Sequence, residues 1–188
     1  MPNRATSLFS AGPLALIGMI AAVALTRLIP HPPNFSSVEA MALFGGAYLA
    51  KRSWAVLVPP IALFISDLAL GLMKGGEYFQ YFVSAGFLLV YLTIAVLSVF
   101  GFGLRGKVSV ARVAGYGIVG SVLFFLVTNF GVWFGSAYYP QTASGLMAAY
   151  AAGIPFLQNG ILGTLFYSAV LFGSYEVLKQ RIPALARN

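Results

Sequence analysis

Few side chains in this chain of 188 residues could carry chemistry. It has one histidine, His31, and four acidic residues, and cysteine is absent. Imidazole is a good ligand for cobalt, nickel or zinc, but a single histidine without cysteine does not make a metal site. The serines also lack the glycine-flanked context of a hydrolase nucleophile. The sequence therefore predicts no enzyme, no metal site and no cofactor.

The acidic residues differ in what their positions imply. Asp67 stands within an apolar run, and an acid inside a membrane span is a functional candidate by default. The alternative for Asp67 is a buried ion pair, either with Arg27 or with Lys74, which is seven residues on and on the same helix face. Glu39 stands three residues after Ser36, the spacing of a capping box, so its expected role is structural.

His31 lies in the segment R-L-I-P-H-P-P-N-F (27–35), between two apolar runs. The three prolines of this segment stiffen it. Two interpretations stay open: the imidazole contacts a solute or metal ion, or it serves only the connection between two helices.

The composition is that of an integral membrane protein. Hydrophobic residues make up 60% of the chain, charged residues 8%, and the mean hydropathy is +0.88. A soluble domain carries about 25% charged residues and could not bury this much apolar surface. The net charge of +7 would suggest nucleic acid in a soluble protein. Here it is explained by topology, and no nucleic-acid partner is expected.

The apolar runs predict an all-α fold, a bundle of six transmembrane helices forming one domain over residues 1–188. A span needs roughly 20 mostly apolar residues. The expected spans are about 8–29, 36–50, 53–73, 79–102, 111–134 and 155–178. The second is short and rich in glycine, so we expect it to be tilted, broken or buried in the bundle.

The cations predict the orientation of this bundle. With the N-terminus in the cytoplasm, nine of the 11 lysines and arginines fall inside, and only Arg27 and Lys74 fall outside. This distribution obeys the positive-inside rule. Both termini are therefore expected in the cytoplasm, and the chain in a bacterial inner membrane. The first run resembles a cleavable signal peptide, but it is long enough to span.

Polar side chains gather toward the predicted outer face. Buried polar groups in a bilayer are costly, so they are expected to face one another or a wet cavity. The sequence thus predicts an outward pocket for a small molecule, whereas an aromatic belt at the interface is the alternative. The candidate binding residues are His31, Asn34, Asp67, Tyr78, Gln80, Tyr81, Asn129, Trp133, Tyr138, Tyr139, Tyr150, Gln158 and Asn159.

The connection before the last span is about 20 residues long and uncharged, as a lid or binding element often is. Ser144 to Ala152 is expected to form a short helix over the site, and Pro155 to be the first residue of the last span. A second glycine-rich stretch, Gly101 to Val108, has the glycine and lysine spacing of a phosphate-binding loop. It follows an apolar run and lacks the Mg²⁺-binding hydroxyl, so we reject that interpretation.

Several motifs carry a resemblance to known proteins. They are R-L-I-P-H-P-P-N-F (27–35), A-L-F-G-G-A (42–47), S-D-L-A-L-G (66–71), T-N-F-G-V-W (128–133) and Y-P-Q-T-A-S-G-L (139–146). Together they resemble an uncharacterised family of bacterial membrane proteins, which is similar to the substrate-binding S components of energy-coupling-factor (ECF) transporters. The resemblance implies binding of a vitamin or metal ion through the loops after spans 1, 3 and 5.

The same resemblance implies partners. S components present small residues of their first helix to a coupling subunit, and Ala11, Ala15, Gly18 and Ala22 have that spacing here. A coupling subunit and ATPases are therefore expected partners. The chain looks most similar to solitary cobalamin-uptake S components (the BtuM type), but it lacks the cobalt-ligating cysteine of that group.

The function expected from the sequence is uptake of a vitamin-type small molecule, with cobalamin or a related corrinoid as the candidate solute. Two alternatives remain. One is a cobalt or nickel permease using His31, Asp67 and Glu77. The other is a membrane assembly or accessory protein whose polar residues only join helices.

Overall fold

The computed structural model describes residues 11–82, 84–135, 137–182 and 185, and all the regular elements in these ranges are helices. The α-helices are α1 (Ala11–Leu25), α2 (Val38–Tyr48), α3 (Arg52–Lys74), α4 (Gly76–Phe82), α5 (Ala85–Phe100), α6 (Val110–Gly135) and α7 (Ala143–Arg181). Two 3₁₀-helices, η1 (Thr26–Leu28) and η2 (Gly101–Leu104), extend α1 and α5.

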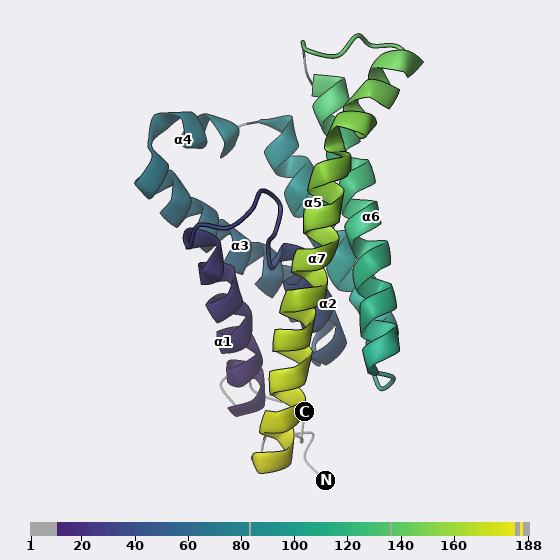
Figure 1. The fold of residues 1–188 in the computed structure, drawn as a ribbon. Coiled ribbons are helices and arrows are strands. Elements are labelled where there is room, and N and C mark those ends of the chain that lie inside the picture. Colours follow the sequence, from purple (N-terminus) through teal and green to yellow (C-terminus); the bar gives the residue numbers. More distant parts are fainter. Residues whose placement is uncertain (1–10, 83, 136, 183–184, 186–188) are drawn as a thin grey trace.

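The helices form a bundle with two distinct ends (Figure 1). The start of α1 and the end of α7 lie together at one end, which we call the terminal end. Helix α4 and the connection from α6 to α7 lie at the other, which we call the loop end. The long helices α6 and α7 pack against each other along most of α6, and the 39-residue α7 reaches from one end to the other (Figure 1).

Among the residues that the structure describes, four helices are long and apolar enough to cross a membrane: Arg52–Lys74, Ala85–Leu104, Val110–Gly135 and Ala143–Arg181. A shorter apolar helix covers Gly12–Leu28. Helix α2 has 11 residues, or roughly 16 Å of rise, which is about half of a hydrocarbon core. The six predicted spans thus correspond to four full-length helices, one shorter apolar helix and one half-length helix.

Helix α2 is the centre of the packing. From Val38 to Ala47 every residue is buried. At its C-terminal half the α2 backbone touches the end of α5: a Cβ on Gly46 would collide with the carbonyl oxygen of Ser98 and lie 2.9 Å from Cα of Gly101. A short helix surrounded in this way needs small residues where its backbone meets a neighbouring backbone, which explains the glycines and alanines of its sequence.

Arg105 completes the C-terminal end of α2. Its guanidinium donates to the carbonyl oxygens of Gly46 (2.8 Å), Leu49 (2.7 Å) and Ala50 (3.3 Å). Gly46 is in the last turn of α2, Leu49 is its C-cap and Ala50 follows, and carbonyls at the end of an α-helix lack partners within the helix. The stretch that carries glycine and lysine at phosphate-loop spacing is therefore a 3₁₀-helix followed by a helix-capping arginine.

Replacing Arg105 with alanine is expected to lower the free energy of unfolding by about 2 kcal/mol, because three carbonyl oxygens lose a charged donor at once. The melting temperature in detergent measures this loss. Arg112→Ala is the matched control, since Arg112 is exposed and makes only a 3.4 Å contact to the carbonyl of Gly103. Equal melting temperatures for the two variants would contradict the capping role.

Two predicted helix boundaries are wrong. The predicted fourth span is divided at Ser84, whose side chain accepts from the backbone N–H of Phe87 and caps α5. The predicted short helix at Ser144 to Ala152 is part of α7, which begins at Ala143 with Thr142 as its cap. Pro155 is inside α7 rather than at its start. Proline removes one backbone hydrogen bond, and the first turns of α7 lean away from the rest of the helix (Figure 1).

Candidate binding site

The connection between α1 and α2 lies against the middle of α7, where residues 29–34 are exposed and Ser37 is buried. A Cβ on Gly163 of α7 would lie 2.8 Å from the backbone nitrogen of Ser36. Asn159 donates from Nδ2 to the carbonyl oxygen of Pro33 at 2.9 Å. The ring of Phe35 packs against those of Phe166 and Tyr167. Glycine at position 163 and the amide of Asn159 therefore allow non-helical backbone to approach a helix closely.

Asn34 forms the turn of this connection. Its φ of 60° lies in the left-handed region, which asparagine tolerates better than most residues. The turn is closed by two backbone bonds, from Phe35 N to Pro32 O (3.0 Å) and from Ser36 N to Asn34 O (2.9 Å). These two bonds satisfy the backbone N–H groups of Phe35 and Ser36 within the connection itself.

A cavity of about 290 Å³ lies above this connection, toward the loop end. Its volume is at the lower end of the range of small-molecule sites, about 300–1,000 Å³. Residues from the α1–α2 connection and from α2 to α7 line it: Arg27, His31, Asn34, Ser36, Val38, Glu39, Leu63, Asp67, Leu70, Lys74, Tyr78, Val90, Ser121, Phe124, Phe125, Thr128, Asn129, Phe156, Leu157 and Gly160. The lining includes two acidic residues, Glu39 and Asp67, and two basic residues, Arg27 and Lys74, besides His31 and Tyr78.

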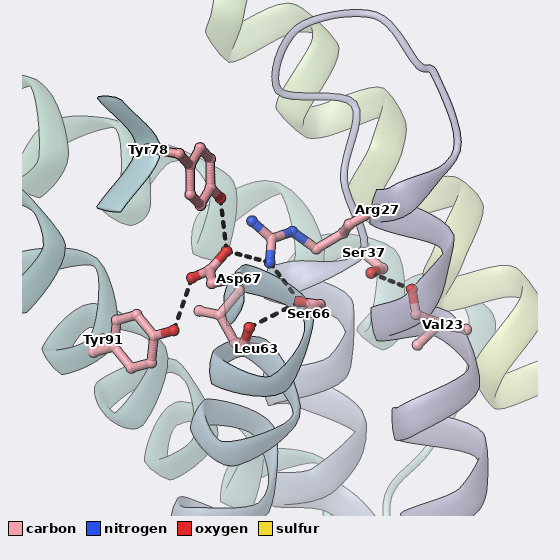
Figure 2. Close-up of polar contacts among 8 residues, drawn as sticks. All are labelled: Val23, Arg27, Ser37, Leu63, Ser66, Asp67, Tyr78 and Tyr91. Carbon is pink, nitrogen blue, oxygen red and sulfur yellow. Dashed lines mark hydrogen bonds and ion pairs between the residues drawn. The ribbon is translucent and has the colours of Figure 1, made fainter. Parts of the chain in front are cut away.

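Asp67 is the centre of a polar network in the wall of the cavity (Figure 2). Its Oδ1 is 2.7 Å from Nη1 of Arg27 and accepts from the hydroxyl of Tyr78 at 3.0 Å. Its Oδ2 accepts from the hydroxyl of Tyr91 at 2.7 Å. Arg27 also donates to Oγ of Ser66 at 2.6 Å. Of the two partners predicted for Asp67, the structure selects Arg27.

Tyr78 stays protonated and donates to this network. Burial, and then the negative charge of Asp67, raise the pKa of Tyr78 to about 12. The ammonium of Lys74 lies 5.6 Å from the centre of the Tyr78 ring, at the exposed side of the cavity. The hydroxyl of Tyr78 therefore joins the buried ion pair of Arg27 and Asp67 to helix α4.

Glu39 does not form the predicted capping box. The cap of α2 is Ser37, and Ser37 Oγ donates to the carbonyl of Val23 at 2.8 Å rather than to its own helix. The helix begins one residue later than the capping-box spacing requires, so Glu39 cannot reach back to the cap. Its side chain is 4% exposed and lines the cavity, and its Oε2 has no hydrogen-bond partner among the described residues.

Five of the residues predicted to bind a solute line the cavity: His31, Asn34, Asp67, Tyr78 and Asn129. His31 is exposed, and its Nδ1 lies 2.9 Å from the carbonyl of Pro32, which leaves Nε2 for other contacts. Asn129 donates from Nδ2 to the carbonyl of Phe125 in its own helix. Arg27 and Glu39 also line the cavity, although the sequence predicted only an ion pair for Arg27 and a helix-capping role for Glu39.

The other predicted residues have different surroundings. Trp133 donates to Pro140 O, and Gln141 to Trp133 O, so they fasten the α6–α7 connection. Tyr150 donates to the carbonyl of Leu126, and Asn159 fastens the α1–α2 connection. The remaining residues are outside the set that lines the cavity: Gln80, Tyr138 and Gln158 are exposed and Tyr139 is half-buried. The side chain of Tyr81 lies outside the described part of the structure, as does that of Glu77.

The small face of α1 points away from the core for part of its length. Gly18 and Ala22 are exposed and Ala15 is half-buried. A Cβ on Gly18 would meet no described atom within 4 Å. The side chain of Ala11 lies outside the described residues. Within the described residues, no group of three or more histidine, cysteine, aspartate or glutamate side chains is placed to hold a metal ion.

Comparison with known families adds one finding. A family model described as a family of unknown function, DUF6580, matches residues 8–185. The chain belongs to the DUF6580 family. Neither the curated proteins nor the solved structures gave a match. The match spans the whole bundle, including every residue that lines the cavity.

Because Asp67 is buried and paired, Asp67→Asn is expected to lower the free energy of unfolding by roughly 2–4 kcal/mol, since Arg27 is left as an uncompensated buried charge. The double variant Arg27→Gln/Asp67→Asn is expected to lose less than the sum of the two single variants. Unfolding in detergent measures all three.

Glu176→Gln provides the comparison for Asp67→Asn. Glu176 and Lys179 form a half-exposed ion pair near the end of α7, and such a pair contributes about 0–1 kcal/mol. Additive losses at Arg27 and Asp67, or a loss at Asp67 no greater than at Glu176, would contradict the role of the buried pair.

Proposed function

We propose that this protein binds a small polar solute from the side of the loop end and takes part in its uptake across a bacterial inner membrane. The cavity of about 290 Å³ carries this proposal, because it combines buried charged groups with aromatic walls inside an apolar bundle. Proteins avoid placing ionisable groups at this depth unless the groups pair or serve a site. The buried Glu39 carboxylate, with one unpartnered oxygen among the described residues, is not explained by pairing.

The cavity favours a solute smaller than a corrinoid. A corrin ring with its side chains is several times larger than 290 Å³, whereas a single-ring vitamin or its precursor is of a suitable size. We therefore propose a vitamin-type solute of modest size and keep cobalamin as one arm of the test. A cobalt or nickel permease has less support, because the described residues offer no cluster of metal ligands.

Charge supports an outward-facing loop end. The cations Lys51, Arg52, Arg105, Lys107, Arg112, Lys179 and Arg181 flank the helix ends opposite to the cavity. Among these, Arg105 and Lys179 border one recess together with the end of α2. Of the cations in the described ranges, only Arg27 and Lys74 line the cavity. By the positive-inside rule, the terminal end would lie in the cytoplasm.

Uptake would then involve partners, as the resemblance to S components implies. The exposed small residues Gly18 and Ala22 would allow a helix of a coupling subunit to approach α1 closely. ATPases bound to that subunit would supply the energy. If the protein instead only assembles with other membrane proteins, the cavity would bind no solute.

A thermal-shift screen in detergent tests solute binding. The compounds are thiamine, pyridoxine, biotin, riboflavin, pantothenate, nicotinamide, cobinamide and cobalamin, together with Co²⁺ and Ni²⁺. A ligand that binds only the folded state raises the melting temperature, by an amount that grows with concentration above its Kd. We expect a shift with one compound or one chemically related group.

Gly160 provides the blocking variant for this screen. Gly160→Leu would place a side chain in the cavity and is expected to abolish the shift. Gly160→Ala is the control, because its Cβ would keep ordinary contacts of 3.9 Å to the Asn34 carbonyl and to Oε1 of Glu39. No shift with any compound, in folded protein, would refute solute binding and favour the assembly role.

Labelling of single introduced cysteines tests the orientation of the protein in the membrane. The chain has no native cysteine, so only the introduced residue can react. Gln141→Cys lies in the exposed α6–α7 connection and Lys107→Cys in the exposed turn before α6. In intact cells, an impermeant maleimide is expected to label only the first variant, and in inside-out membranes only the second. The reverse pattern would place the cavity on the cytoplasmic side.

A further inference from the structure

Two carboxylates in the cavity wall are equally buried and differ in their partners. Asp67 and Glu39 are each 4% exposed. Asp67 has Arg27, Tyr78 and Tyr91 around its two oxygens. Oε2 of Glu39 has no hydrogen-bond partner in the described part of the chain. Burial alone therefore does not explain why an acid stands at position 39.

Neither cation of the cavity forms an ion pair with Glu39 among the described residues. Arg27 is held by Asp67 and Ser66 and acts on Glu39 only through its longer-range charge, and the ammonium of Lys74 is at the exposed side, over the Tyr78 ring. The neighbours of Glu39 on α7 are Gly160, whose Cβ would lie 3.9 Å from Oε1, and Thr164, whose side chain forms a hydrogen bond with the carboxylate. A buried carboxylate without a counter-charge is costly, unless a ligand supplies that charge.

The walls of the same cavity suit a cation. Phe124, Phe125 and Phe156 line it, and aromatic faces attract ammonium groups. Ser36 and Ser121 line it too, and the hydroxyl of Ser121 donates to Oγ1 of Thr164 at 2.9 Å. A buried carboxylate with an unpaired oxygen and no ion pair, in the wall of a cavity that also has aromatic side chains, is an arrangement that suits a positively charged nitrogen.

We propose that Glu39 recognises a cationic nitrogen group of the solute, such as a protonated amine, an amidinium or a quaternary ammonium. This inference rests on the proposed function and narrows its substrate class. Glu39 would then be a binding residue, whereas Asp67 would position Arg27 and the aromatic hydroxyls. The cationic class excludes solutes that carry only carboxylates or phosphates, such as biotin and pantothenate.

Matched probes test the charge requirement on the purified full chain. Choline, benzyltrimethylammonium and thiamine are the cationic probes, and 3,3-dimethyl-1-butanol is the neutral isostere of choline. We expect the cations to raise the melting temperature of the wild-type protein, and the isostere to have at least tenfold weaker effect. In Glu39→Gln the cations are expected to bind at least tenfold more weakly, and in Glu176→Gln as in the wild type.

The ligand-free proteins provide a second measurement. Glu39→Gln removes an uncompensated charge and is expected to melt at the same or a higher temperature than the wild type, whereas Asp67→Asn is expected to melt lower. If Glu39→Gln melts lower, as a structural role predicts, cation binding by Glu39→Leu and Glu39→Asp distinguishes a structural role of Glu39 from a binding role. Only the aspartate is expected to retain cation binding.

The outcomes distinguish this inference from the proposed function. If the isostere binds as well as choline, or if Glu39→Gln keeps its affinity for the cations, the assignment of Glu39 is wrong. If the vitamin screen finds only neutral or anionic ligands, solute binding stands and the cationic class is refuted. If no compound of either set shifts the wild-type protein, both proposals fail.

Discussion

The ion pair between Arg27 and Asp67 is the interaction on which the rest of the structure depends. Arg27 follows α1, Asp67 is in α3, and the two tyrosines on Asp67 come from α4 and α5, so four neighbouring parts of the chain meet at one carboxylate. In a medium of low dielectric, moving either residue out of the pair would leave the other charge without a counter-charge, which is costly. The pair therefore sets the depth at which α1 ends and the connection to α2 begins. That depth is beside the middle of α7, well short of the loop end (Figure 1).

A non-helical connection at this depth has consequences for function. Irregular backbone inside a membrane is tolerated only where it is buried in protein or lines a cavity. Here both conditions apply: Gly163 and Asn159 of α7 cover one side of the connection, and the cavity is on the other. The half-length helix α2 follows from the same constraint, since it begins at this depth and ends at the terminal end. The cavity is thus the space that a full-length second helix would have filled.

Much of this arrangement is predictable from hydropathy and charge. The long helices follow from residue types and spacing. Burial is one of three outcomes expected for the short second segment, and Arg27 is one of two partners expected for Asp67. Two features escape this reasoning for physical reasons. The position of Pro155 predicts the start of a helix, but α7 packs along α6 and continues through this residue. The spacing of Glu39 from Ser36 predicts a capping residue, but Ser37 bonds to Val23 in α1, and α2 starts one residue later than that spacing requires. Both errors come from tertiary contacts overriding a local signal.

The contrast between Asp67 and Glu39 separates folding from binding within one cavity. The carboxylate of Asp67 pairs with Arg27 and accepts from two tyrosine hydroxyls, so its charge is balanced before any solute arrives. Glu39 is buried just as deeply, yet one of its oxygens has no partner in the described structure. If stability alone had shaped this position, a glutamine or an apolar residue would serve as well. A buried carboxylate without a partner lowers the stability of the empty protein, and a bound cation would supply that partner. Such a group favours cationic solutes, because a solute without a positive charge leaves the carboxylate unpaired.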